Sequence, residues 1–261
     1  MVDPVKRAEL LGLPFDFMTM EEAVDRCLSW CGGPRVPHTV ITANSGILCM
    51  MRRDPELRQA CIAGDLILAD GMSVVWTSRM TNTPFPERVA GVDLMTELLA
   101  AGAKRGLSAY FLGAKREVVS KLAEKCAKDF AGLKVAGHRD GYFSPADHPA
   151  IVAEIRALEP HFLFVGMPSP FKEAWGEKNR EGLGVPVIMG VGGSFDVLAG
   201  YVQRAPRWLQ SIGMEWSWRL MMEPRKMWKR YLTTNAEFLW IAGREMVLRR
   251  LRRATGAGCA P

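Results

Sequence analysis

Short apolar runs alternate with amphipathic stretches along the first two hundred residues. Six of these runs predict buried strands, at 37–43, 66–69, 108–113, 133–137, 161–166 and 186–191. The segments between them have the apolar spacing of helices. Strands that alternate with helices in this way form right-handed crossovers and a mostly parallel sheet. The pattern therefore predicts an α/β, Rossmann-like fold.

Polar residues mark where several helices begin. Thr19, followed three residues later by Glu22, forms a capping box, and one strand-like piece precedes it. Asn44 can cap a helix that ends near Arg53, and Asp54-Pro55 begins the next one. A further helix is expected from Gly91 to Arg105.

The pattern changes near residue 200. No further strand is predicted, and five of the eight Trp fall in the remaining segment. Pro224 separates a helix at about 213–223 from a longer one at about 225–250. Apolar residues share one face of the longer helix: Trp228, Tyr231, Leu232, Phe238, Leu239, Ala242 and Met246. We expect a catalytic domain over 1–200 and a Trp-rich helical appendage over 201–261.

Composition and charge narrow the classes of protein. The chain is 48% hydrophobic and 24% charged, as in globular proteins. Its formal charge of +6 resides in the appendage, where twelve Lys and Arg face four Asp and Glu from Gly200 onward. This excess indicates an anionic partner there. The first residues lack an apolar signal sequence, and no stretch is long enough for a spanning helix. We expect a cytoplasmic protein.

Candidate catalytic and ligand-binding residues follow the predicted strands directly. Asp70 follows a buried run directly, and the carboxyl ends of parallel strands are where open α/β sheets bind ligands. A helix cap or turn is the alternative for this Asp. Glycine-rich turns follow Phe111, Val165 and Met189, and their backbone N–H groups can approach a phosphate. Asp196 could reach ribose hydroxyls and Tyr142 could stack on a base, so the turns suggest a nucleotide crevice.

Other chemistries lack their motifs. Cys27 and Cys31 have no further ligands at metal spacing, and the four His residues show no zinc pattern. The chain contains no Walker loop, nucleophile elbow or dinucleotide fingerprint, which disfavours a hydrolase and an oxidoreductase. A non-catalytic protein that binds a nucleotide, a membrane or nucleic acid stays open, although it would leave Asp70, Arg88 and Asp196 without a role.

Several ordered motifs together resemble one family. They are Thr42-Ala-Asn44, Ala69-Asp-Gly71, Glu87-Arg-Val-Ala-Gly91, Asp140-Gly-Tyr-Phe143, Gly166-Met-Pro-Ser-Pro-Phe-Lys-Glu173, Gly190-Val-Gly-Gly-Ser-Phe-Asp196, Arg204-Ala-Pro, Glu215-Trp and Glu223-Pro-Arg. The chain resembles the WecG/TagA/CpsF glycosyltransferases (glycosyltransferase family 26) over nearly its whole length. The resemblance implies inverting transfer of a sugar from a UDP-sugar to an undecaprenyl-diphosphate-linked saccharide. The reaction would need neither a metal nor a cofactor. Nucleic acid is not expected as a partner.

The resemblance also implies roles for particular residues. Asp70 matches the base that activates the acceptor hydroxyl, and we place Thr42 beside it as catalytic. Tyr142 matches a residue that stacks on uracil, and Asp196 one that holds the nucleoside. Substrate contacts are expected at Asn44, Arg88, Tyr142, Lys172, Glu173, Gly192, Gly193, Asp196, Arg219, Arg225, Lys226, Lys229 and Arg230. The last five belong to the appendage, which is expected to close over the diphosphate.

Two further expectations concern substitution and location. Many family members have Gln where this chain has Lys172, and this difference is expected to change the contact with the donor sugar or with the acceptor. Trp beside Lys and Arg suits a bilayer interface, so we expect a peripheral protein on the inner face of the cytoplasmic membrane. The apolar face of 225–250 could instead meet another subunit, so a homo-oligomer stays open.

Overall fold

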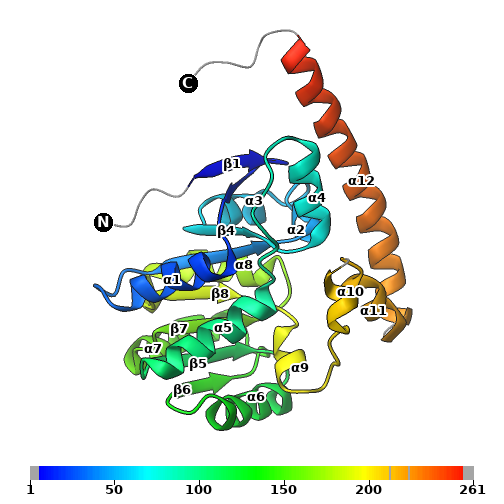
Figure 1. Ribbon diagram of the computed structural model, residues 1–261. Helices are drawn as coiled ribbons and strands as arrows, with labels where there is room; N and C mark the ends of the chain where they lie inside the picture. Colours follow the sequence, from blue (N-terminus) through cyan, green and yellow to red (C-terminus); the bar gives the residue numbers. More distant parts are fainter. Residues whose placement is uncertain (1–5, 212, 223, 255–261) are drawn as a thin grey trace.

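Six parallel strands form one sheet in the computed structural model of the chain (Figure 1). The structure describes residues 6–211, 213–222 and 224–254, with the backbone alone described at 211, 219, 225–227, 229–232 and 250–254. In sheet order, the strands are β4 (Leu66–Ala69), β3 (His38–Ala43), β8 (Val187–Gly190), β7 (Phe162–Gly166), β5 (Ser108–Gly113) and β6 (Lys134–Arg139). All five pairings are parallel. The predicted α/β fold is confirmed.

Helices cover both faces of this sheet, which explains why its strands, apart from the edge strand β6, are buried at nearly every position. Val40 faces one hydrophobic cluster and the next residue, Ile41, faces another. The first face carries α1 (Met20–Cys31), α5 (Gly91–Lys104), α6 (Arg116–Asp129) and α9 (Ser194–Leu198). The other carries α2 (Ser45–Met50), α3 (Pro55–Ile62), α4 (Met72–Met80), α7 (His148–Leu158) and α8 (Phe171–Leu183), with the short 3₁₀ helix η1 (Pro145–Asp147) before α7.

The predicted helix starts are confirmed at atomic detail. Thr19 and Glu22 form the expected capping box at the start of α1. The Asp54 carboxylate accepts a hydrogen bond from the Leu57 N–H at 3.0 Å, and Pro55 begins α3. These local contacts satisfy N–H groups that the helix itself leaves without partners.

An antiparallel hairpin near the amino end differs from the single strand-like piece that was predicted. Strand β1 (Arg7–Leu10) pairs with β2 (Leu13–Asp16). The two connecting residues both have positive φ, 56° at Leu11 and 82° at Gly12. Such a turn normally carries Asn or Gly at its first position. Because Leu11 stands there, the turn could not be predicted from the usual turn residues.

In the part of the C-terminal segment that the structure describes, there are three helices: α10 (Arg207–Ser211), α11 (Glu215–Met222) and α12 (Pro224–Ala254). The predicted break at Pro224 is confirmed, whereas α10 was not foreseen. In Figure 1, α12 runs along one side of the molecule next to α2. It buries Phe238, Ile241 and Ala242, while Leu239 is 71% exposed, so Phe238 and Leu239, which were expected on one apolar face, lie on different sides of the helix. Among the described residues, no helix is long and apolar enough to cross a membrane.

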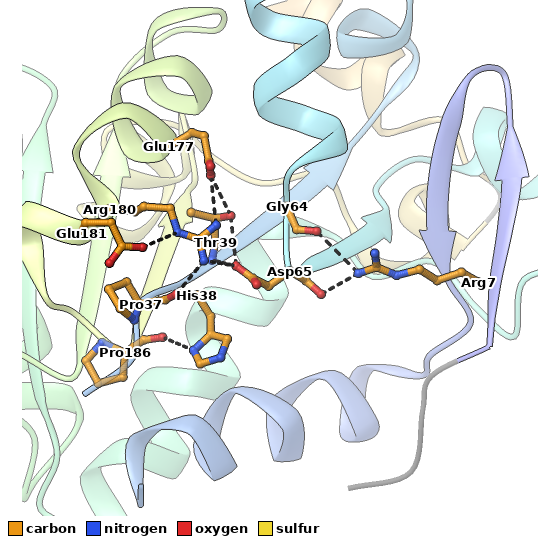
Figure 2. A network of polar contacts seen from close by, with 10 residues as sticks. All are labelled: Arg7, Pro37, His38, Thr39, Gly64, Asp65, Glu177, Arg180, Glu181 and Pro186. Carbon is orange, nitrogen blue, oxygen red and sulfur yellow. Dashed lines mark hydrogen bonds and ion pairs between the residues drawn. The ribbon is translucent and has the colours of Figure 1, made fainter. Parts of the chain in front are cut away.

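A network of hydrogen bonds and ion pairs joins the amino ends of β3 and β4, at the edge of the sheet opposite the predicted site (Figure 2). Arg180 on α8 donates to the Asp65 carboxylate at 3.0 Å and to the Pro37 carbonyl at 2.8 Å. Asp65 also accepts from the Thr39 N–H at 2.8 Å, and its carbonyl accepts from Arg7 of the hairpin at 2.7 Å. The network stabilises the scaffold and leaves the carboxyl ends available for ligands.

Candidate active site

Asp70 lies where the sequence placed it, directly after the last residue of β4. Its backbone N–H donates to the Ala43 carbonyl at 3.0 Å, which fixes it between the carboxyl ends of β3 and β4. Gly91, the first residue of α5, approaches both this carboxylate and Thr42. A Cβ at Gly91 would lie 2.8 Å from Thr42 Oγ1 and 3.8 Å from Asp70 Oδ2. The two predicted catalytic side chains therefore converge on one helix start.

The surroundings of Asp70 suit a proton acceptor. Burial raises the pKa of its carboxyl to about 6, against the ordinary 3.8. Arg88 and the Gly91 N–H oppose this increase in the pKa, whereas Glu215 and Asp93 add to it. A carboxylate with such a pKa is ionised at neutral pH and still accepts a proton more readily than a solvated Asp.

Asn44 occupies the end of β3, next to Asp70. Its side-chain oxygen accepts from the N–H groups of Gly46 and Ile47, at 2.9 and 3.2 Å, and so caps α2. Because the oxygen is used by the cap, the Asn44 NH₂ group is the part that can contact a ligand. The cap is the structural role of Asn44, and its substrate contact stays a prediction.

A cluster of two arginines and two carboxylates adjoins Asp70. Arg88 Nη1 lies 3.1 Å from Glu215 Oε2, and Arg88 Nη2 lies 3.8 Å from Asp93 Oδ2. Arg204 forms a bidentate pair with Asp93, in which Nη2 lies 2.6 Å from Oδ2. Its Nε also lies 3.4 Å from Glu215 Oε1. Together with Arg207, these arginines line an open cavity of about 710 Å³.

The glycine-rich turn after β8 receives Lys172 from the start of α8. A Cβ at Gly190 would lie 3.2 Å from Lys172 Nζ, so the absence of a side chain there makes room for the ammonium group. Gly192 has a φ of +52°, and Gly193 precedes the first helical residue of α9. This turn and the Lys172 cation together form an environment that favours an anion.

Glu173 holds Lys172 in that position. Its carboxylate pairs with the Lys172 ammonium and accepts from Ser169 Oγ at 2.8 Å. The Glu173 side chain is buried, and its Oε2 has no hydrogen-bond partner in the described structure. Glu173 is therefore buried against Lys172 and Ser169, and its predicted substrate contact stays a prediction.

Tyr142 lies in the loop after β6, which packs against the end of β5. The Gly141 N–H donates to the Ala114 carbonyl at 2.9 Å, and the Tyr142 N–H donates to Asp140 at 3.0 Å. The Tyr142 side chain is 75% exposed, so its ring face is accessible for stacking. A second cavity, of about 330 Å³, lies beside it at the sheet edge.

Strand order decides which predicted residues meet. Neighbouring strands lie roughly 4.8 Å apart, so the end of β8, which the glycine-rich turn and then Asp196 of α9 follow, is about 10 Å from the end of β4. The end of β5, over which the Tyr142 loop folds, is about 19 Å from it. Asp70, Thr42, Asn44 and Arg88 thus form one end of the site, and Tyr142 lies at the other.

Five predicted contacts fall outside the described side chains. Arg219 lies in α11, and the others lie in α12: Arg225, Lys226, Lys229 and Arg230. Their assignment to a diphosphate stays a prediction.

Sequence reasoning did not assign a role to three members of the arginine cluster. Arg204 and Glu215 are part of motifs shared with the family, which was the available signal. Asp93 carried no signal, because an acidic residue in the first turn of a helix is common.

The comparisons with known proteins identify the family. Residues 8–253 match the family described as glycosyl transferase WecG/TagA/CpsF. The chain belongs to this family. It is 34% identical over 194 residues to an N-acetylglucosaminyldiphosphoundecaprenol N-acetyl-β-D-mannosaminyltransferase of Bacillus spizizenii, with 74% of each chain covered. It is 32% identical over 199 residues to the protein of the same name from Bacillus subtilis, with 76% of this chain and 77% of the relative covered.

Membership of the WecG/TagA/CpsF family confirms the resemblance and makes the chain a glycosyltransferase. The oxidoreductase and the non-catalytic binding protein are therefore set aside. No group of three or more metal-ligating side chains occurs among the residues that the structure describes. That the reaction proceeds without a metal stays a prediction.

Proposed function

We propose that the enzyme transfers a sugar from a UDP-sugar to an undecaprenyl-diphosphate-linked saccharide, with inversion at the anomeric carbon. The observation that carries this proposal is the placement of Asp70, a partly buried carboxylate with a raised pKa at the ligand-binding edge of a parallel sheet. The names of the relatives supply the acceptor class, since both act on N-acetylglucosaminyldiphosphoundecaprenol.

The reaction proceeds in one displacement. An acceptor hydroxyl gives its proton to Asp70 while its oxygen attacks C1 of the donor sugar. The bond between C1 and the phosphate oxygen breaks, and UDP leaves with the electron pair. Holding the hydroxyl against C1 lowers the barrier further, because it replaces a collision between free molecules.

Cationic groups stabilise the departing diphosphate. Arg88 lies beside Asp70, and Lys172 with the glycine-rich turn lies at the next strand ends. Groups fixed before the reaction stabilise developing negative charge without reorganising. Tyr142 and Asp196 bind the uridine farther along the edge, and the basic residues of α11 and α12 close over the site.

The C-terminal segment also contacts the cytoplasmic membrane, where a lipid-linked acceptor resides. Large apolar side chains are exposed along it: Trp208, Trp216, Met221, Met222 and Trp228. The same segment carries the excess of Lys and Arg. Aromatic rings beside cations suit the headgroup region of a bilayer.

The proposal is tested with purified enzyme, a panel of UDP-sugars and a synthetic lipid-diphosphate N-acetylglucosamine, with products read by mass spectrometry. UDP-N-acetylmannosamine is the first donor to test, because of the names of the relatives. Transfer from at least one UDP-sugar is expected, and UDP should raise the melting temperature where NAD does not. Transfer from another nucleotide-sugar alone would refute the UDP assignment.

A further inference from the structure

The arginine cluster beside Asp70 has an unequal internal arrangement. Asp93 holds Arg204 through two hydrogen bonds and belongs to the first turn of the 14-residue helix α5. Asp93 also lies 3.8 Å from Arg88 Nη2, whereas Glu215 makes one closer contact to each arginine and belongs to the eight-residue helix α11. Its Oε2 is 3.1 Å from Arg88 Nη1, and its Oε1 is 3.4 Å from Arg204 Nε. Asp93 is therefore the anchored carboxylate and Glu215 the exchangeable one.

Glu215 occupies the place of an oxyanion. Two guanidinium groups directed at one pair of oxygens form the arrangement by which proteins bind phosphates. The side chains are only partly exposed, at 15% for Arg88, 25% for Arg204 and 28% for Glu215. Arginines left without a counter-charge in such surroundings would destabilise the free enzyme, so a carboxylate from the protein is useful there.

We propose that Arg88 and Arg204 together bind a substrate diphosphate, and that Glu215 occupies their site until the diphosphate replaces it. This inference rests on the proposed function for the identity of its ligand. In the free enzyme two arginines face two carboxylates. When Glu215 leaves, two arginines face Asp93 alone, and the diphosphate supplies the missing negative charge. Arg207 and Gln210 line the same cavity and offer further donors.

Replacement of Glu215 by the diphosphate also makes the contacts of the C-terminal segment depend on ligand binding. Glu215 is in the first turn of α11, and it joins this helix to Arg88 in the loop before α5. A diphosphate that takes its place breaks both ion pairs of Glu215. Binding at the site therefore frees the start of α11 from Arg88 and Arg204.

Calorimetric titration of two probes tests the proposal. UDP represents the donor, and farnesyl diphosphate represents a lipid diphosphate. Glu215→Gln removes the competing charge, so at least one probe should bind about fivefold more tightly, as expected for an ion pair of modest strength. Arg204→Gln should weaken binding of the same probe about tenfold or more. The probe that responds identifies which diphosphate occupies the site.

Two control variants make the outcome specific. Glu215→Asp keeps the charge and should bind the responding probe about as the unaltered enzyme does. Glu237→Gln removes the ion pair to Arg53 from α12 and should change neither affinity. If Glu215→Gln weakens both probes or leaves both unchanged, the proposal is wrong, even where Arg204→Gln fails to fold.

The titration separates this inference from the proposed function, because it requires no turnover. An enzyme that shows the expected affinities but transfers no sugar would refute the proposed function alone. An enzyme that transfers sugar from UDP-sugars without the Glu215 effect would refute this inference alone.

Discussion

At the scale of single residues, the buried position of Asp70 lowers the stability of the folded protein. Its pKa in the folded protein is about 6, above the ordinary 3.8, so the folded state holds the proton more tightly than the unfolded state. Stability therefore falls as the pH rises from about 4 to about 6, and the full cost persists above that range.

Asp70→Asn should remove this cost. We expect its free energy of unfolding to exceed that of the unaltered enzyme by about 1–3 kcal/mol at neutral pH, because burial of the amide does not remove a charge from water. Below pH 4 the two proteins should be equally stable. Urea unfolding across this pH range measures the difference, and a constant difference would contradict the assigned pKa.

Lys172 offers a second prediction at this scale. Lys172→Met leaves the buried Glu173 carboxylate without its cation, so we expect a loss of about 3 kcal/mol in the free energy of unfolding. Lys172→Gln should lose less, since an amide can still donate to Glu173. Lys178→Met, on the exposed side of the same helix, should change stability by less than about 0.5 kcal/mol. Equal losses in Lys172→Met and Lys178→Met would exclude the buried pair.

Individual residues were predictable where local rules apply. The position of Asp70 after a strand, the Asn44 cap and the capping box at Thr19 follow from neighbours in the sequence. The contact between Glu215 and Arg88 joins residues 127 positions apart, so no local rule could reveal it. The burial of Glu173 was not foreseen, because burial of a charged residue in a first helical turn has no sequence signature.

Elements were predicted well where their periodicity was clear. The six strands appear at their expected positions within a few residues, because apolar runs bounded by turns are distinctive. In α12 the apolar residues surround the helix, and the buried face is set by what packs against it. Phe238 meets the cluster around α2, whereas its neighbour Leu239 faces solvent.

Docking of α12 gives a prediction at the level of elements. Phe238 is 4% exposed, and Phe238→Ala should lower the free energy of unfolding by about 3–5 kcal/mol through the cavity it leaves. Leu239→Ala, one residue along, should change it by less than about 0.5 kcal/mol. Hydrogen exchange should show faster exchange in α12 for the first variant alone. Similar exchange in both variants would mean that α12 does not dock through this face.

At the largest scale, the order of strands was beyond sequence reasoning. The chain visits β4 before β5, yet three strands lie between them in the sheet. Non-local pairing of this kind depends on which helices cover which face, and local patterns do not report that. The boundary at residue 200 between a catalytic domain and an appendage stays a prediction, and α12 shares a buried cluster with β1, β2 and α2.

Membrane contact is tested on the intact enzyme. Co-sedimentation with vesicles that contain phosphatidylglycerol should be strong at low salt and should weaken as salt screens the basic segment. Trp208→Ala should reduce binding, since this side chain is 65% exposed. Leu158→Ala, an exposed apolar residue on α7, should leave it unchanged. Equal binding to uncharged vesicles at all salt concentrations would contradict an electrostatic contact.

The most direct test of the mechanism compares turnover and UDP affinity in Asp70→Asn. We expect turnover to fall by about 100- to 10,000-fold, the usual contribution of a general base, while the dissociation constant of UDP stays nearly unchanged. In the unaltered enzyme, kcat/KM should fall below a pH of about 6, as Asp70 becomes protonated. A variant that retains normal turnover, or an unaltered enzyme whose kcat/KM is constant through that pH, would show that Asp70 is not the base.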